Sequence, residues 1–507
     1  MPVSNGVTTY PAKHTLSAVA ILSLVAFCIF AALDLDTAKV VTMGARDVVT
    51  GTFDWLFIHA VSGILFLSLL LALHPAASAR IGHAHTRPDF SRWSWFAMLF
   101  SAGLASGLVY WGTAEPIMHF GGNPFVAARA SGEQAAATAV TITVFHWGMH
   151  GWALYCVAGL AIALSAYRRD VPLSFSAALA PVLGARANGV LGRVADLIAL
   201  YGTVFGVATS IGLAVGSMNA VIAPLVGVPF NRTAQLMMVV VISLLGVLSV
   251  LSGVANGIRR LSELNVWLSL GLLLVIVIAG PTAWLVAALP ANLSDYVRHV
   301  VPMGLWLADD PQGHTWQSDW TVFYWGWWLA WTPFVAMFIA RISKGRTIRE
   351  FILGVLFVPA LVVLVWMSVF GDTAIHQELM ATGAVSEAVA RDYSLGLVAT
   401  INNLPEPGLQ GVLMPLVAVL LFTWLITSLD SATLVICHIL HVDHLRSMKV
   451  LWGFILGGVT CTLMLIGGIQ ALQAASIIIG LPMVLLMGLL AVSAIRLVVM
   501  RDDAPTT

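Results

Sequence analysis

The chain has 507 residues, of which 59% are hydrophobic and only 9% are charged, and its mean hydropathy is +0.93. Soluble proteins carry roughly 25% charged residues, so most of this surface must face something other than water. The formal net charge is zero and no basic or acidic block occurs, which argues against nucleic acid as a partner. The four cysteines are far apart and form no CxxC pair, so they indicate neither a disulfide framework nor a zinc site.

Long apolar runs recur along the whole chain. A helix that spans a membrane needs about 20 mostly apolar residues. By this criterion we predict an all-α, multi-pass membrane protein with twelve transmembrane helices. The predicted spans are 15–34, 54–74, 92–112, 135–166, 190–225, 233–254, 264–289, 318–341, 352–371, 410–438, 449–469 and 474–498.

The distribution of basic residues predicts the orientation of these spans. Six of the 24 Lys and Arg residues fall on one predicted side, which leaves eighteen on the other. Because loops rich in Lys and Arg stay in the cytoplasm, we expect both termini there. The six are Lys39, Arg46, Arg129, Arg232, Arg298 and Arg391.

Small and polar residues interrupt two of the predicted spans. The third contains Gly103, Ala105 and Gly107, and the tenth contains Thr427 and Ser428. Interrupted helices at matching positions of two halves are typical of secondary transporters, although glycines four residues apart also fit close helix packing.

We therefore predict one membrane domain at 15–498, between short cytoplasmic tails at 1–14 and 499–507. Within this domain, 15–74 forms an extra pair of helices. Residues 92–289 and 318–498 form two five-helix repeats.

The eighth span carries an unusual row of aromatic residues. Trp327, Trp331, Phe334 and Phe338 are spaced by four and three residues, so they share one helical face. A quaternary ammonium has no proton to donate, and aromatic faces hold such a cation with about 0.5–2 kcal/mol each. The row predicts a site for an onium ligand, with simple packing as the alternative.

A second aromatic cluster lies in the fourth span. Trp152 and Tyr155 share a face there, and Trp147 lies within reach of the same side. His146 and His150 could form half of a metal site, but no third ligand is evident beside them. The aromatic interpretation is favoured.

Several segments together resemble the betaine/choline/carnitine transporter family. Phe323–Phe351 is similar to its eighth-helix signature, His146–Tyr155 to its fourth-helix motif, Trp111–Pro116 to its third helix and Phe205–Ser210 to its fifth. The resemblance covers essentially the whole membrane domain. It implies a LeuT-like inverted repeat formed by helices 3–7 and 8–12, transport by alternating access, and a homotrimer in the bacterial inner membrane.

The resemblance also implies roles for individual residues. The aromatic box that binds substrate would consist of Trp147, Trp152, Tyr155, Trp327, Trp328, Trp331 and Phe334. Phe338 would flank the cytoplasmic path, and the unwound part of the third helix would be Gly103, Ala105 and Gly107.

A sodium ion, as the coupling ion, would bind the backbone carbonyls of Ser101 and Leu104 and the hydroxyls of Thr427 and Ser428. The alternative for both hydroxyls is a hydrogen bond back to their own helix. Sodium-independent carnitine exchangers of the family carry an arginine near the start of the seventh helix. The matching stretch, 261–266, contains no basic residue, which favours sodium coupling. No organic cofactor is expected.

Choline transporters of the family often carry an aspartate where Gly107 stands, so its absence favours a net-neutral zwitterion such as glycine betaine or dimethylsulfoniopropionate. The alternatives are a sodium-independent choline or carnitine uniporter, a proton symporter and a substrate:product antiporter. A membrane enzyme is a distant alternative, because Glu115, Asp372 and Asp430 lie in or at the edge of three separate spans.

Overall fold

The computed structural model describes residues 13–103, 106–126, 131–252, 255–380 and 383–499. Within these ranges the regular structure is helical, with one isolated antiparallel bridge between Arg80 and Thr347. The long helices are α1 (His14–Leu33), α2 (Leu35–Leu73), α3 (Arg92–Gly103), α4 (Ser106–Gly121), α5 (Gly132–Trp147), α6 (Met149–Arg169), α9 (Val190–Val226), α10 (Arg232–Ser252), α11 (Ala255–Ala279), α12 (Thr282–Leu305), α14 (Phe323–Ile342), α15 (Ile348–Leu379), α18 (Gln410–Ile439), α19 (Arg446–Gly467) and α20 (Ile469–Val499).

Short helices fill the connections between the long ones. They are η1 (Pro75–Ser78), α7 (Phe175–Ala178), α8 (Ala180–Leu183), η2 (Gly184–Asn188), α13 (Pro311–Gln317), the π-helical turn η3 (Ser318–Val322), α16 (Ala384–Arg391), η4 (Tyr393–Leu395) and α17 (Gly396–Asn402).

Ten helical segments of the described chain are long and apolar enough to cross a membrane. Two further pairs meet the criterion together but are bent, α3 with α4 by 56° and α11 with α12 by 116°. Counting each bent pair as one span gives twelve, the predicted number. The division into two inverted repeats stays a prediction.

Two predicted boundaries differ clearly from the structure. The second helix starts at Leu35 rather than at 54, because the Asp34 side chain caps its first turn by accepting a hydrogen bond from the Thr37 backbone. Hydrogen bonds from Thr37 also hold the pKa of the Asp34 carboxyl below its usual value. The charged residues between 35 and 53 hid this extension from a hydropathy criterion.

The predicted seventh span, 264–289, is wrong at its end. Helix α11 stops at Ala279, and the chain turns by 116° through Gly280 and Pro281 into α12. Proline lacks the backbone N–H and its ring clashes with the previous turn, and together with the flexible Gly280 it favours a break at this point. The predicted span therefore joins the end of α11 to the first residues of α12, a separate helix across a sharp bend.

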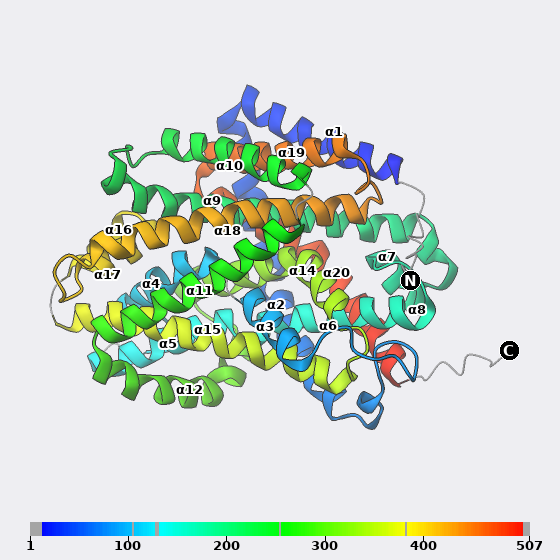
Figure 1. Cartoon of the computed structure of the whole chain (residues 1–507), viewed down its shortest axis with the longest axis horizontal. Helices are drawn as coiled ribbons and strands as arrows, with labels where there is room; N and C mark the ends of the chain where they lie inside the picture. Colours follow the sequence, from blue (N-terminus) through cyan, green and yellow to red (C-terminus); the bar gives the residue numbers. More distant parts are fainter. Residues whose placement is uncertain (1–12, 104–105, 127–130, 253–254, 381–382, 500–507) are drawn as a thin grey trace.

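The aromatic helix α14 lies in the middle of the molecule, where it packs against α6, α9 and α20 (Figure 1). Glycines allow this close approach. A Cβ atom on Gly326 of α14 would lie 2.9 Å from the backbone of Ile477, and one on Gly480 of α20 would lie 2.8 Å from Gly326. A Cβ on Gly206 of α9 would lie 3.0 Å from the Ala330 backbone. The two neighbouring helices thus fix α14 at backbone contact distance.

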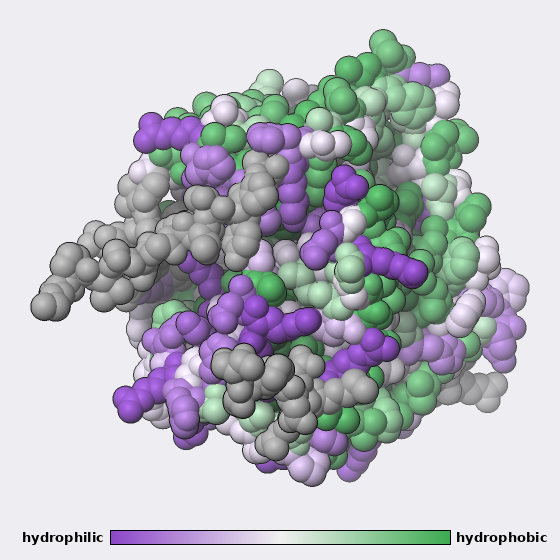
Figure 2. All heavy atoms as spheres, turned by 90° about the vertical axis from the view of Figure 1, so that its right-hand side faces the viewer, coloured by the Kyte–Doolittle hydropathy of each residue, from purple (hydrophilic) through white to green (hydrophobic). Residues whose placement is uncertain are grey.

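The first helix begins and the last helix ends on the same side of the molecule, next to α7 and α8, whereas α16 and α17 lie at the opposite end (Figure 1). Viewed onto that first side, hydrophilic residues gather across the face and hydrophobic ones along its flank (Figure 2). An even number of spans places the start of the first helix and the end of the last helix on the same side of the membrane. Which end faces the cytoplasm stays a prediction from the basic residues.

The topology can be tested with single cysteines introduced into a variant in which the four native cysteines are replaced. Glu387 in α16 and Arg186 in η2 are both exposed and lie at opposite ends. We expect a membrane-impermeant maleimide to label Glu387→Cys in intact cells, and Arg186→Cys only after permeabilisation. The reverse pattern would invert the predicted orientation.

Candidate ligand-binding site

A cavity of about 80 Å³ lies between α4, α6 and α14 near the centre of the fold. A water molecule needs roughly 10–15 Å³ of space, so the cavity has room for a small ligand. We call it the aromatic cavity. It is lined by Ala102, Ser106, Gly107, Trp147, Trp152, Tyr155, Ser210, Trp327, Trp328, Trp331, Val335, Val363 and Ser428.

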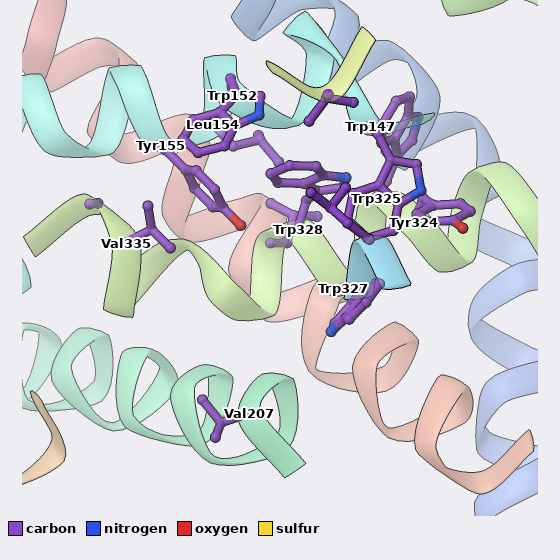
Figure 3. Packing of buried hydrophobic residues seen from close by; sticks show 14 of the residues in the cluster. Trp147, Trp152, Leu154, Tyr155, Val207, Tyr324, Trp325, Trp327, Trp328 and Val335 are labelled. Carbon is purple, nitrogen blue, oxygen red and sulfur yellow. The ribbon is translucent and has the colours of Figure 1, made fainter. Parts of the chain in front are cut away.

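The structure thus brings together six of the seven aromatic residues predicted for the box, from the fourth and eighth predicted spans. Figure 3 shows Trp152, Tyr155 and Trp328 grouped side by side, with Trp147 and Tyr324 next to them. Trp152 and Tyr155 each pack against Trp328, with ring centroids 5.8 and 5.1 Å apart.

A break in the fourth predicted span positions its aromatic residues. Helix α5 ends at Trp147 and α6 begins at Met149, with Gly148 between them. The Tyr296 hydroxyl accepts a hydrogen bond of 2.9 Å from the Met149 backbone N–H, one of the donors that the break leaves without a helical partner. The break places Trp147 at the end of one helix and Trp152 and Tyr155 on the next.

Hydrogen bonds from the indole N–H groups fix the rings of α14. Trp328 donates to the His146 carbonyl at 2.9 Å, and Trp331 donates to the Gly206 carbonyl at 2.9 Å and to the Ser210 hydroxyl at 2.8 Å. With their N–H groups used in this way, the rings are held by their edges. Both rings line the aromatic cavity, and an aromatic face there attracts a cation.

Phe334 does not line the aromatic cavity. It contributes instead to an adjoining cavity of about 280 Å³, the Thr427 cavity, which shares Ala102, Trp331, Val335 and Ser428 with the aromatic one. The cause is helical geometry, because Phe334 lies about one turn beyond Trp331 on the same face of α14. It meets the Trp331 ring edge-on at 5.1 Å.

Phe338 lines the Thr427 cavity and also a cavity of about 530 Å³ together with Tyr167, Arg341 and Lys344. These shared residues link three cavities in sequence, from the aromatic cavity to the end of the molecule that carries Arg341 and Lys344. That end is the one predicted to face the cytoplasm.

The predicted sodium ligands lie partly together. Ser101, Thr427 and Ser428 all line the Thr427 cavity, whereas Leu104 lies outside the described residues. The Thr427 hydroxyl donates to the Thr423 carbonyl at 2.9 Å, as the back-bonding alternative required. Its oxygen retains lone pairs, so back-bonding and cation binding are compatible. Of the predicted unwound segment, Gly103 ends α3, Gly107 lies in the first turn of α4, and Ala105 is also outside the described part.

Glu115 is the residue that sequence reasoning missed. Its carboxylate is fully buried and lies within hydrogen-bond distance of four residues. We call Glu115 and these four residues the Glu115 cluster. The four are His146 (Nδ1 to Oε1, 2.6 Å), His119 (Nε2 to Oε1, 3.4 Å), Trp147 (Nε1 to Oε2, 2.9 Å) and Tyr324 (hydroxyl to Oε2). The other two acidic residues lie elsewhere, Asp372 bonded to Asn292 and Asp430 to Ser249.

The ligand atoms of Glu115, His119 and His146 lie within 4.8 Å of one another, an arrangement that can hold a metal ion. Hydrogen bonds already use these atoms. Both oxygens of Glu115 have partners, and His146 Nε2 lies 3.0 Å from the Thr321 hydroxyl. We therefore interpret the cluster as a hydrogen-bonded network. His150, which the sequence does not favour as half of a metal site with His146, stacks on Trp325 and is not among the three residues whose ligand atoms lie together.

The opposite end of the molecule contains a larger and more polar cavity of about 760 Å³, with Arg46, Arg232, Arg391 and Asp319 in its wall. It shares no lining residue with the aromatic cavity. A continuous series of ring contacts separates the two, from Trp327 through Phe323 and Trp111 to Trp320. The aromatic cavity thus borders the cavities toward the Arg341 end and shares no lining residue with the cavity at the Arg46 end.

Residues 15–503 match the model of the betaine/carnitine/choline family of transporters. The chain belongs to this family. It is 38% identical over 472 residues to glycine betaine transporter 1 of Vibrio parahaemolyticus, covering 91% of this chain and 88% of that one. It is 37% identical over 455 residues to the glycine betaine transporter OpuD of Bacillus subtilis, covering 88% and 87%. An osmo-dependent choline transporter of Acinetobacter baylyi, BetT2, is 36% identical over 444 residues, covering 86% and 64%.

Membership of this family makes the protein a membrane transporter and not an enzyme. The meeting of titratable groups at Glu115 is therefore not a catalytic centre.

The fit between α6 and Trp328 gives a first test of this geometry. A Cβ atom on Gly151 would lie 2.3 Å from the Trp328 ring, so Gly151→Ala must displace that ring. We expect a loss of stability of about 1–3 kcal/mol from overpacking, measured as a lower melting temperature of the purified protein. Gly63→Ala in α2 is the matched control, because nothing lies within 4 Å of its added Cβ. Equal melting temperatures for both variants would contradict the close contact between Gly151 and Trp328.

Proposed function

We propose that this transporter imports a small quaternary-ammonium zwitterion, glycine betaine, in symport with sodium across the bacterial inner membrane. The observation that carries the proposal is the aromatic cavity, in which five tryptophans and one tyrosine surround a volume that suits a ligand of this size. Two of the relatives named above are glycine betaine transporters.

The chemistry of the cavity wall favours a trimethylammonium group. Such a group is permanently charged and cannot donate a hydrogen bond, so it is held by the quadrupoles of aromatic faces. Three or four faces at about 0.5–2 kcal/mol each give an affinity strong enough for uptake and weak enough for release. A sulfonium zwitterion such as dimethylsulfoniopropionate satisfies the same requirements.

The charge of the wall favours a zwitterion over a cation. Among the described residues that line the aromatic cavity, all are uncharged, and serine hydroxyls supply the polar atoms. A bare cation such as choline would enter a membrane interior with no counter-charge in contact, whereas betaine carries its own. Choline transport is the second candidate because BetT2 is named as a choline transporter.

The linked cavities suggest how the substrate leaves. The aromatic cavity borders the Thr427 cavity, which borders the cavity with Arg341 and Lys344, whereas ring contacts from Trp327 to Trp320 lie between it and the Arg46 end. This arrangement corresponds to an inward-facing state of an alternating-access cycle, with both termini in the cytoplasm. The homotrimer implied by the family remains part of the proposal.

Uptake of labelled glycine betaine into proteoliposomes tests the function. We expect saturable uptake by the purified protein, and we expect Trp328→Leu to raise KM by about 2- to 30-fold, as loss of one cation–π contact implies. Trp93→Leu is the control, because Trp93 is 84% exposed and outside the cavity. Equal KM values for the two variants would contradict the assigned site, and saturable uptake of choline without betaine would favour the second candidate.

The sodium site is tested by the salt dependence of the same uptake. With potassium replacing sodium at equal membrane potential, we expect accumulation to stop. Thr427→Ala should raise the half-saturating sodium concentration at least about tenfold, because it removes one oxygen ligand of a cation. Thr462→Ala serves as control, since Thr462 makes the same back-bond, to the Gly458 carbonyl at 2.8 Å, on an exposed surface. Equal betaine uptake in sodium and in potassium would contradict the proposal of sodium coupling, but it would not affect the substrate assignment.

A further inference from the structure

The Glu115 cluster lies directly behind the aromatic cavity without being part of its wall. Glu115, His119, His146 and Tyr324 are all fully buried, and the only member of the cluster that lines the cavity is Trp147. The Trp147 indole is therefore the direct contact between Glu115 and the cavity wall.

A carboxylate in this position is costly. Removing an ionised group from water inside a membrane protein requires several kcal/mol unless hydrogen bonds and opposite charges compensate it, and such residues are usually functional. Of the groups that the structure records in contact with Glu115, only the imidazoles of His119 and His146 can carry a compensating positive charge. All four partners can donate to the carboxylate, so both of its oxygens accept hydrogen bonds when Glu115 is ionised.

We propose that Glu115 is a positioning residue that makes Trp147 a stronger cation-binding face and thereby selects onium substrates. The inference rests on the proposed function. Trp147 donates its indole N–H to Glu115 Oε2 at 2.9 Å, a charge-assisted hydrogen bond of roughly twice the ordinary strength. This bond fixes the ring, and the carboxylate shifts electron density of the indole toward its faces, which strengthens their attraction for a cation.

Neighbouring rings show where that face points. Trp147 meets Trp327 edge-to-face with centroids 5.6 Å apart and Trp328 at 6.0 Å, so the three rings form one corner of the cavity. The negative charge of Glu115 lies behind this corner, one indole away from the ligand. Acting through the Trp147 ring, this charge strengthens the attraction of the corner for the onium end of a zwitterion.

The test compares glycine betaine with 3,3-dimethylbutyrate, which has the same shape and carboxylate but a neutral carbon in place of the ammonium nitrogen. For each variant, the inhibition constants of both compounds against labelled betaine uptake are measured in proteoliposomes, and their ratio gives the preference for positive charge. A change in packing alone moves both constants together and leaves the ratio unchanged.

Glu115→Gln keeps the shape and an oxygen that accepts from Trp147, but removes the charge. We expect it to lower the preference for betaine about tenfold and to raise the KM for betaine with a smaller effect on Vmax. Trp147→Phe removes the indole N–H that bonds to Glu115. In the Trp147→Phe background, Glu115→Gln should therefore change the preference for betaine by less than about threefold. Glu387→Gln, on the exposed surface of α16, is the control for loss of a carboxylate.

Three results would overturn the inference: an unchanged ratio in Glu115→Gln, full additivity of the two substitutions, or a fall in Vmax alone. If Glu115→Gln does not fold, Glu115→Asp carries the test, because it retains the charge. The ratio should then survive within about threefold of wild type, and its collapse in the folded Asp variant would contradict the proposal.

A failure of the proposed function gives a different result. If the wild-type protein does not transport betaine, binding of tetramethylammonium to the purified protein is measured by calorimetry. Weaker binding to Glu115→Gln than to wild type then supports the role of Glu115 even though the substrate assignment fails. Equal binding of tetramethylammonium to the wild type and to Glu115→Gln would contradict the proposed role of Glu115.

Discussion

The close approach of α14 to α9 and α20 is the constraint on which the rest of the structure depends. Gly326 and Gly480 bring two helix backbones into contact, and Gly206 does the same on the other side. In a membrane, helices gain little from burying apolar surface against each other, so small residues that permit backbone contact are a main source of packing energy. This contact places an aromatic helix in the protein interior instead of at the lipid.

Once α14 is central, its tryptophans need partners for their N–H groups. Trp328 finds the His146 carbonyl near the end of α5, and Trp331 finds the Gly206 carbonyl and Ser210 on α9. The ring edges therefore bind protein, and both rings line the cavity. The same interactions that satisfy buried donors thus create a surface suited to a ligand that cannot form hydrogen bonds.

The break in the middle of the fourth predicted span and the first turns of the eighth also meet at Glu115. The break at Gly148 brings His146 and Trp147 to this carboxylate, and Tyr324 reaches it from α14. Three helices, α4, α5 and α14, are thereby joined by polar contacts in the layer behind the cavity. This network ties the geometry of the ligand site to the arrangement of the helices that surround it.

The sequence alone determined the features that depend on local pattern. The number of spans followed from hydropathy, and the shared face of Trp327 and Trp331 followed from helical periodicity. Because the family motifs are local too, they indicated six of the residues that line the aromatic cavity. Properties read over about 20 residues need no knowledge of distant partners.

Only the tertiary structure decided features that join distant segments. It placed Phe334 in the adjoining cavity, turned the chain at Gly280–Pro281 into α12, and brought Glu115 to His146 across 31 positions of sequence. Hydropathy missed the start of α2 because charged residues obscured a helix that packing and an Asp34 cap sustain. Such contacts depend on the packing of whole helices against each other, and no single segment encodes them.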